Sequence, residues 1–512
     1  MAENLRAIVA VLVLAIPTFW YLREPLTAQV ISRADYNRRV GMWIALTIVL
    51  FVAGNFWLFV LASALLLLTF GRRDSNPLAM YLFLLFVAPP FESLIQGFGS
   101  INNFIAIDYL RLLSLVVLLP MAFVLLSRPT TPGLLKMPTD KYVFGYIALL
   151  LILQAPLSST THLLRSAVSD LIDTLLPYYV FSRGISNARR LREAATSFVA
   201  AGSVLAVIGV FESLKGWLLY SSLSNVLGVR WGYGSYMLRE GSLRATASAG
   251  HSIVLGYLLT VALGLHLMLQ SVLGNRRYWV ILALLLGAGI VATMSRGPWV
   301  GAAAVVVVAS VMGPGAAKRL GTYAALAFLA APILLITPVG GKIISVLPFI
   351  GTVDSSTISY REQLFNVSWD VLMLNPIFGS PHFMSNAALE QLRQGEGIID
   401  MVNSYLGVAM VSGFVGLGLF SGAFVSSAVG LWRHLVRHPD KGGDDYRTGL
   451  ALLATLVGVL LILATASSIN AIPVVYWCLV GTCSAYLRFA RVEREAWSRS
   501  PIGRVGMPAQ PL

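Results

Sequence analysis

The 512-residue sequence has few charged residues and almost no cysteine. Only 12% of its residues are Asp, Glu, Lys or Arg, whereas about a quarter are charged in a typical soluble domain. Its two cysteines, Cys478 and Cys483, lie within one apolar stretch, so neither a disulfide framework nor a CxxC metal pair is indicated. No metal and no cofactor are expected. These shortages exclude an ordinary soluble or disulfide-stabilised protein.

Hydrophobic residues are in large excess. They make up 57% of the chain, and the mean hydropathy is +0.76. Windows of about twenty apolar residues, the length that crosses about 30 Å of hydrocarbon, recur throughout. The sequence therefore predicts an all-α polytopic membrane protein with about 12–15 transmembrane helices, GT-C-like, and a large periplasmic loop. Residues 42–70 fit either one long tilted helix or two helices broken around Asn55.

The basic residues indicate the orientation of the spans. The net charge of +14 comes from short clusters between apolar stretches, such as Arg72-Arg73, Arg276-Arg277 and residues 488–494. Short loops rich in Lys and Arg stay in the cytoplasm, so the charge reflects topology and no nucleic-acid partner is expected. The chain is predicted to be a multi-pass protein of a bacterial inner membrane with a cytoplasmic C-terminus.

The same pattern divides the chain into four predicted parts. The predicted parts are a transmembrane bundle at 1–338 that includes a periplasmic segment at 215–250, a periplasmic loop with amphipathic helices at 339–401, C-terminal transmembrane helices at 402–488, and a cytoplasmic tail at 489–512. The loop at 339–401 carries more polar groups than a simple connection between helices needs. We expect it to contribute to a site.

Several arginines lie on the predicted outer side, against the positive-inside bias. A guanidinium offers planar, bidentate donors and stays charged, which suits a phosphate or pyrophosphate ligand. The alternative is that these arginines contact lipid headgroups or pair with Glu240 and Glu362. The arginines on this side are Arg230, Arg239, Arg244, Arg296 and Arg361.

Two of these arginines have distinctive local contexts. Arg296 lies in the tight turn Ser295-Arg296-Gly297-Pro298 between two apolar spans, which Gly and Pro explain but the arginine does not. Arg361 begins a segment in which Phe365, Trp369 and Leu372 recur at helical spacing, which predicts a helix on the outer surface.

Four segments occur in an order that resembles the O-antigen ligase and polymerase superfamily, roughly between residues 195 and 418. Val402 stands where the family has the histidine that is its proposed base, and valine has no group that accepts a proton. Ser252 and Ile253 replace the family's Pro-Asn. The segments are residues 244–256 with Gly250-His251, Ser295-Arg296-Gly297, Arg361 with Phe365 and residues 375–379, and residues 402–406 with Gly413.

The resemblance implies a metal-independent, inverting glycosyl transfer from a polyprenyl-pyrophosphate-linked glycan. Arg244 and Arg361 are the expected catalytic cations, and Arg296 joins them in binding the pyrophosphate. Asp400 is the leading candidate for the base, although it could instead cap the helix that begins near Val402.

Further polar residues are candidates for the acceptor or for a secondary site. His251 could instead cap its helix, His382 could lie in a turn, and Glu212 could be an ordinary interfacial carboxylate. Asn403 and Tyr405 belong to the fourth segment. The secondary candidates are therefore His251, His382, Asn403, Tyr405 and Glu212.

The leading functional hypothesis is polymerisation of undecaprenyl-pyrophosphate-linked repeat units into exopolysaccharide or O-antigen at the periplasmic face. A ligase that transfers a finished glycan to a lipid or protein acceptor is the alternative within the superfamily. An ion-coupled or polysaccharide transporter is the alternative from another class, because Arg165, Asp170 and Asp173 lie within one apolar span. Membrane lipids, a chain-length regulator and export machinery are the other expected partners.

Overall fold

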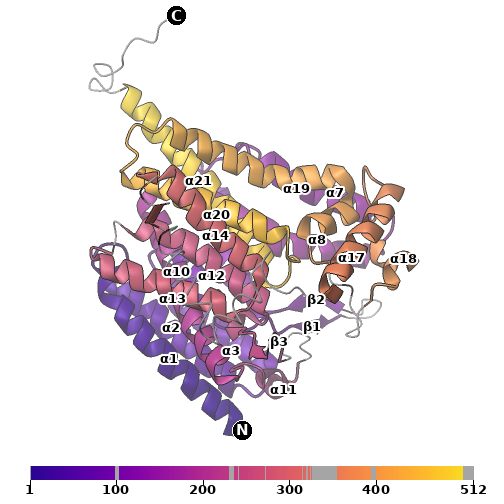
Figure 1. The fold of residues 1–512 in the computed structure, drawn as a ribbon, viewed down its shortest axis with the longest axis horizontal. Helices are drawn as coiled ribbons and strands as arrows, with labels where there is room; N and C mark the ends of the chain where they lie inside the picture. Colours follow the sequence, from indigo (N-terminus) through magenta and orange to yellow (C-terminus); the bar gives the residue numbers. More distant parts are fainter. Residues whose placement is uncertain are drawn as a thin grey trace, which may run out of the picture.

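The computed structural model shows a bundle of long helices with only two short hairpins (Figure 1). It describes residues 2–97, 103–229, 236–239, 241–270, 273–313, 355–393, 399 and 401–499, with a few positions between 315 and 325. Within these residues, 8 helices are long and apolar enough to cross a membrane. The prediction of an all-α polytopic membrane protein is confirmed.

The N-terminal elements alternate in direction along the bundle. The break at Asn55 settles the two possibilities for residues 42–70 in favour of two helices, because the Asn55 side chain accepts a hydrogen bond from the Trp57 N–H at 2.8 Å and caps the second one. The elements are α1 (Ala2–Thr27), α2 (Arg33–Val52), α3 (Phe56–Phe70), η1 (Gly71–Arg73), α4 (Pro77–Leu84), β1 (Ser93–Gln96), β2 (Asn103–Ile107), α5 (Tyr109–Leu113), the π-helical η2 (Ser114–Leu118) and α6 (Leu119–Ser127).

The middle of the chain contributes the most buried helices. The strands β1 and β2 pair antiparallel, as do β3 and β4. The elements are α7 (Asp140–Gln154), α8 (Thr160–Asp170), the π-helical η3 (Leu171–Leu175), α9 (Leu176–Gly184), α10 (Ala188–Lys215), α11 (Leu223–Leu227), β3 (Leu238–Arg239), β4 (Ser242–Leu243), η4 (Ala247–Ala249), α12 (Ser252–His266), η5 (Leu267–Gln270), α13 (Arg276–Ala292) and α14 (Arg296–Met312).

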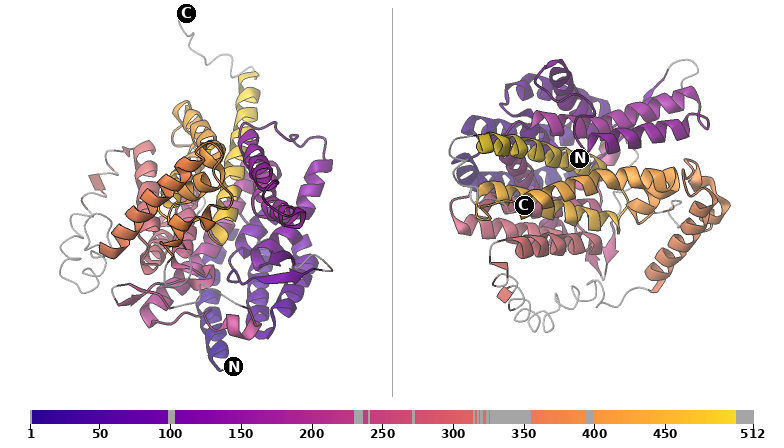
Figure 2. Two further views of the ribbon diagram at one scale, coloured as in Figure 1. Left: turned by 90° about the vertical axis from the view of Figure 1, so that its right-hand side faces the viewer. Right: turned by 90° about the horizontal axis from the view of Figure 1, so that it is seen from above.

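The C-terminal part adds three long helices and a side arm. Figures 1 and 2 show α17 and α18 at one side of the bundle, next to α19. The elements are α17 (Ser355–Leu374), η6 (Phe383–Ser385), α18 (Ala387–Glu390), α19 (Ser404–Val436), α20 (Asp444–Leu463) and α21 (Ala471–Arg499).

The centre of the bundle is formed by α10 and α12, which are buried over most of their length. The first packs against α1, α4, α12 and α13, and the second also against α14 and α20. Small residues allow these helices to approach closely, as membrane helices require. A Cβ on Gly264 of α12 would lie 2.1 Å from Thr455 Oγ1 of α20, so no larger residue fits there.

One end of the bundle, here called the basic end, contains buried ion pairs around residues 72–76 and 183–193 and a half-buried contact between His434 and Asp445. Arg39 pairs with Asp74 at 2.7 Å and with Glu193 at 2.6 Å, and the Arg39 side chain is fully buried. These contacts tie α2, α4 and α10 together. Because both carboxylates depend on one guanidinium, losing Arg39 would leave uncompensated buried charge, which is strongly destabilising.

Two charged residues of the 163–181 region, Arg165 and Asp173, find partners in other elements. Asp173 forms a 2.6 Å ion pair with Arg111 of α5, and the guanidinium of Arg165 donates to the Asn103 and Phe104 carbonyls of β2. Charged groups inside a membrane are tolerated when they are paired in this way. The Arg111–Asp173 pair therefore joins two neighbouring spans.

Candidate functional site

The end of the bundle opposite the basic end brings three of the four sequence segments together and is here called the motif end. It comprises residues 212, 239, 241–251, 292–297, 401–405 and 465–470. Arg244 donates from Nη2 to Ser295 Oγ at 3.0 Å, and Arg239 donates from Nη1 to the Met294 carbonyl at 2.8 Å. The hairpin of β3 and β4 is thereby held over the turn between α13 and α14, which places Arg244 beside the residue that precedes Arg296.

Hydrogen bonds and backbone conformation fix the turn between α13 and α14 in this position. Met294 has a φ of +48°, a conformation uncommon outside glycine. Ser295 is buried and its hydroxyl donates to the Thr293 carbonyl at 3.0 Å, so its oxygen is free to accept from Arg244. The Ala245 N–H donates to the Ala292 carbonyl at 3.1 Å and adds a backbone link.

Glu212, at the last turn of α10, organises the segment after Arg244. Its side chain is fully buried, and its carboxylate accepts hydrogen bonds from three backbone N–H groups. Leu219 donates to Oε1 at 3.0 Å, while Thr246 and Ala247 donate to Oε2 at 3.0 and 2.8 Å. In this arrangement Glu212 positions the Arg244 segment and has no free oxygen turned toward solvent.

We expect Glu212→Gln to lower glycan transfer about tenfold while the protein is still produced. The amide keeps one acceptor, but its NH2 group faces a backbone donor, and an unsatisfied buried group costs about 1–3 kcal/mol. Polymer yield per amount of membrane protein would measure the effect. Glu3→Gln, at an exposed position of α1, is the matched control. Equal yields from both variants would contradict the positioning role of Glu212.

The Arg244 side chain is half-buried, and its guanidinium has no carboxylate partner among the described residues. Its Nε is buried and has no hydrogen-bond partner, and no carboxylate pairs with its guanidinium in the described part of the chain. Burial, together with the charge of Arg239, lowers the pKa of Arg244 to about 10, so the group is still protonated at neutral pH. A buried charge without a counterion is costly unless it serves a ligand. The arrangement is suited to an anion.

His251 caps the N-terminus of α12. Its Nδ1 accepts from the Ile253 N–H at 3.2 Å. Burial and the charge of Arg244 lower the pKa of His251 to about 4, so the ring is neutral at pH 7 and a weak base. With Nδ1 engaged, His251 fits a role in holding the helix start beside Arg244.

The low pKa of His251 predicts a pH-dependent stability. The folded-state pKa of about 4 lies below the unfolded value of about 6.5, so between these values the unfolded chain binds the proton more strongly. The contribution of His251 to the free energy of unfolding is fully present above pH 6.5. It is lost as the pH falls toward 4, by at most about 3 kcal/mol. We expect His251→Asn, which retains a capping oxygen but cannot titrate, to flatten the dependence of the apparent Tm on pH. Parallel profiles for both proteins would contradict this assignment.

The start of α19 joins the motif end through the connection between α20 and α21. Asn403 caps α19, and its Oδ1 accepts from the Tyr405 N–H at 2.9 Å. The Ser404 hydroxyl donates to the Ala466 carbonyl at 2.6 Å, and the Tyr405 hydroxyl to the Leu460 carbonyl at 2.9 Å. A Cβ on Gly297 would lie 2.4 Å from Thr465 Oγ1, so this connection also touches α14.

Residues 375–379 insert into a break of α19 at Gly413. The Phe414 N–H donates to the Pro376 carbonyl at 2.8 Å, and the Ser380 N–H donates to the Met410 carbonyl at 2.8 Å. Gly413 has φ +64° and ψ −168°, a conformation essentially restricted to glycine. A Cβ on Gly379 would lie 2.5 Å from the Gly413 nitrogen. The third and fourth sequence segments are therefore interlocked through their backbones.

Arg361 lies exposed on α17, in the side arm that packs on α19. Leu364, Ser368 and Leu372 form the buried face of this helix. Phe365 and Trp369 are 51% and 43% exposed, so the expected stripe is split, with only Leu372 facing inward. The predicted helix exists, but two of its aromatic residues face outward because α19 covers only the neighbouring face.

The remaining predicted residues lie in the side arm, at the start of α14 next to Ser295, or outside the described residues. His382 is exposed, and its carbonyl accepts hydrogen bonds from Ser385 at the start of η6. Arg296 is the first residue of α14 and is half-buried. Asp400, Arg230 and Glu240 lie outside the described residues, as does the first part of the loop, 339–354.

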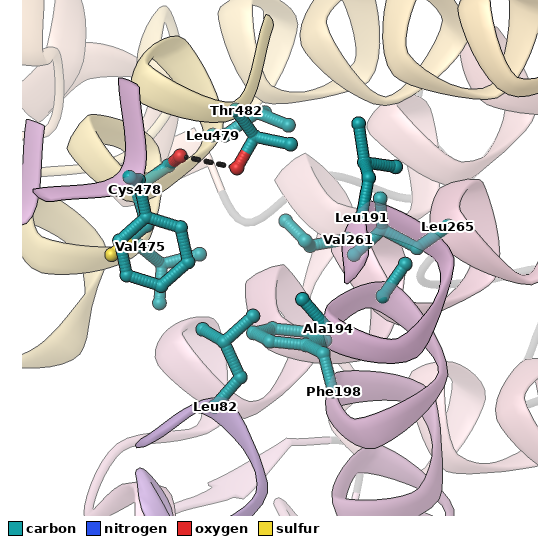
Figure 3. Close-up of a pocket in the computed structure, with 12 residues that line it drawn as sticks. Leu82, Leu191, Ala194, Phe198, Val261, Leu265, Val475, Cys478, Leu479 and Thr482 are labelled. Carbon is teal, nitrogen blue, oxygen red and sulfur yellow. Dashed lines mark hydrogen bonds between the residues drawn. The ribbon is translucent and has the colours of Figure 1, made fainter. Parts of the chain in front are cut away.

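A cavity of about 30 Å³ lies in the bundle core, lined by apolar side chains such as Leu82, Phe198 and Val475 (Figure 3). Its one visible polar contact, from Thr482 Oγ1 to the Cys478 carbonyl at 2.8 Å, is internal to α21. Its lining is almost entirely apolar, so the cavity lacks the polar partners that a bound water needs. It is a packing void of the core.

Two features of the motif end are absent from the sequence-derived site. Ser295 belongs to the second sequence segment but is not a predicted site residue, although it accepts a hydrogen bond from the Arg244 guanidinium. The polar run Thr465 to Asn470 contains no predicted site residue, although the Ser467 hydroxyl donates to the Met401 carbonyl at 2.7 Å. The only sequence signal for this run was four polar residues within an apolar region. Composition alone does not distinguish a segment that contributes to a site from a simple connection between two helices.

The fold and this end of the bundle define a multi-pass membrane protein with a cationic site. Residues 281–421 match the family model described as O-Antigen ligase, and the chain carries that family's domain. The resemblance drawn from the motifs is confirmed, and members of this family transfer lipid-linked glycans. The matched range holds the second, third and fourth segments, while the Arg244 segment precedes it. No curated protein was found that matches the chain.

Proposed function

We propose that this protein polymerises undecaprenyl-pyrophosphate-linked repeat units into exopolysaccharide or O-antigen at the periplasmic face of the inner membrane. In this orientation the basic end faces the cytoplasm, as the positive-inside rule expects, and the motif end faces the periplasm. The C-terminus is then cytoplasmic. Membrane lipids, a chain-length regulator and export machinery are the proposed partners.

The observation that carries the proposal is the uncompensated charge of Arg244. Its guanidinium is held by Ser295, its neighbour Arg239 is also a cation, and Arg296 follows Ser295 directly. A dianionic pyrophosphate would supply the missing negative charge and accept bidentate hydrogen bonds. The headgroup of a polyprenyl carrier would meet this site at the end of the bundle, where its lipid tail can remain in the membrane.

The proposed reaction is a single displacement without a metal. The acceptor hydroxyl oxygen bonds to the anomeric carbon while the bond from that carbon to the pyrophosphate oxygen breaks, which inverts the anomeric configuration. Arg244 and Arg296 stabilise the charge that grows on the departing pyrophosphate, because fixed cations need no reorganisation during the reaction. Arg361 is proposed as a third cation on the side arm, and Asp400, three residues before Asn403, as the base for the hydroxyl proton.

Val402 favours a polymerase over a ligase. It precedes Asn403 at the start of α19, where the resembling ligases have the proposed histidine base. An alkyl side chain there cannot accept a proton. The histidines at nearby positions do not substitute for it, since His251 uses Nδ1 in its cap and His382 lies in the side arm. The side arm, which includes Arg361, is held to α19 by the backbone hydrogen bonds at Gly413.

The intermediate that accumulates in cells without the protein tests the proposal. A polymerase deletion leaves single repeat units on the polyprenyl carrier, whereas a ligase deletion leaves a completed chain on that carrier. Lipid extracts analysed by mass spectrometry distinguish the two. Translocation of glycan in reconstituted vesicles without new glycosidic bonds would instead support the transporter alternative.

A further inference from the structure

Three metal-ligand side chains converge at the basic end, where α19 ends and α20 begins. His434 Nε2 lies 3.0 Å from Asp445 Oδ2, and His438 Nε2 lies 3.1 Å from the same oxygen. His434 lies in the last turn of α19, and His438 lies two residues beyond the end of that helix at Val436, in the connection to α20. All three ligand atoms are within 4.8 Å of one another.

Aromatic rings fix the orientation of both imidazoles. The Tyr486 ring of α21 packs edge-to-face on His434 at 5.4 Å, and the Tyr446 ring of α20 packs on His438 at 5.8 Å. The Tyr486 hydroxyl also donates to the Asp445 carbonyl at 3.0 Å. Surroundings that hold ligand side chains in place are a requirement of metal sites, because they lower the entropy lost on binding.

We propose that His434, His438 and Asp445 form a zinc site that clasps the ends of α19 and α20. Zinc bound at about 2.0–2.1 Å to tetrahedral ligands requires ligand atoms about 3.3 Å apart, close to the two Nε2–Oδ2 separations. Two neutral imidazoles and one carboxylate are ligands that zinc accepts, and here they come from the end of α19, the connection after it and the start of α20. With Nε2 bound to the ion, each neutral ring carries its proton on Nδ1.

The site leaves one coordination position open to solvent. The side chains of His434 and His438 are 10% and 15% exposed and that of Asp445 is 33% exposed, so an ion can enter and keep a water as fourth ligand. Arg433 and Arg437 are exposed on neighbouring positions of α19, where solvent screens their repulsion. The site lies at the end of α19 remote from Asn403, so its role is to hold the helix pair and is separate from glycan transfer.

The test uses the full-length protein in detergent, purified through a tag without histidine and stripped with a chelator. We expect one zinc per chain by elemental analysis, a rise of several degrees in apparent Tm on adding zinc, and visible absorption bands of tetrahedral cobalt on adding Co²⁺. The variants His438→Gln and Asp445→Asn should lose at least tenfold in zinc affinity and show no zinc-dependent rise in Tm. His162→Gln, at an exposed histidine of α8, is the control.

Zinc uptake that is absent in the wild-type protein, or equal in His438→Gln and wild type, would overturn the proposal. A cluster that titrates with pH but takes up no metal would be a hydrogen-bonded bracket between α19 and α20, which also overturns it. If one ligand variant cannot be purified, the other takes its place, and a tetrahedral cobalt spectrum unchanged from that of the wild type would overturn the proposal.

Discussion

Arg244→Ala is expected to reduce the amount of polymer at least about 100-fold, since removing one fixed group that stabilises transition-state charge typically costs a factor of about 10²–10³. The guanidinium is held by Ser295 at 3.0 Å and has no carboxylate partner among the described residues, so its removal does not leave an unpaired acid behind. The structure should tolerate the change. Polymer length on gels and single repeat units in lipid extracts measure the effect.

Two further variants separate charge from geometry. Arg244→Lys keeps the charge, but an ammonium cannot bond Ser295 and also bind a phosphate in the bidentate manner, so its activity should remain well below that of the wild type. Arg277→Ala, at an exposed arginine of α13 at the basic end, should leave polymer unchanged. Wild-type chain lengths from a well-expressed Arg244→Ala protein would refute the assignment of Arg244.

Gly413→Ala is expected to be the most destabilising single substitution in α19. A Cβ there would lie 2.2 Å from the Ile377 carbonyl oxygen, and φ +64° with ψ −168° is strained for any other residue. Backbone atoms on both sides cannot move apart without breaking the bonds that hold residues 375–379. We expect a loss of more than about 3 kcal/mol, seen as a lower apparent Tm and as faster proteolysis of the side arm.

Neighbouring glycines in the same helix provide the controls. A Cβ on Gly407 or Gly418 would meet no atom within 4 Å, so alanine fits at both positions. Because alanine favours helix over glycine by about 1 kcal/mol, both variants should be as stable as the wild type or slightly more stable. Gly379→Ala should reproduce the Gly413→Ala defect, since each glycine contacts the other. A Gly413→Ala protein as stable as Gly418→Ala would show that the interlock is not required.

The sequence indicated many of the residue types that form the site, but it did not indicate how these residues are arranged in space. The arginines on the predicted outer side and the four ordered segments could be identified from the sequence, because loop charge and short motifs are local features of the chain. Glu212 looked like an interfacial carboxylate that might contact a sugar, yet it accepts three backbone hydrogen bonds from segments up to 35 residues away. Such bonds depend on how distant segments meet, which no local pattern encodes.

The sequence by itself determined that this protein is a helical membrane protein and to which family it is related, because hydrophobic length and short motifs are local properties. The tertiary structure alone decided that Arg244 meets Ser295, that Gly379 locks into the break at Gly413, and that Ser404 bonds to the connection after α20. Each of these contacts joins residues distant in the chain. They exist only when helices pack in one particular order, a choice made by side-chain fit across the whole bundle.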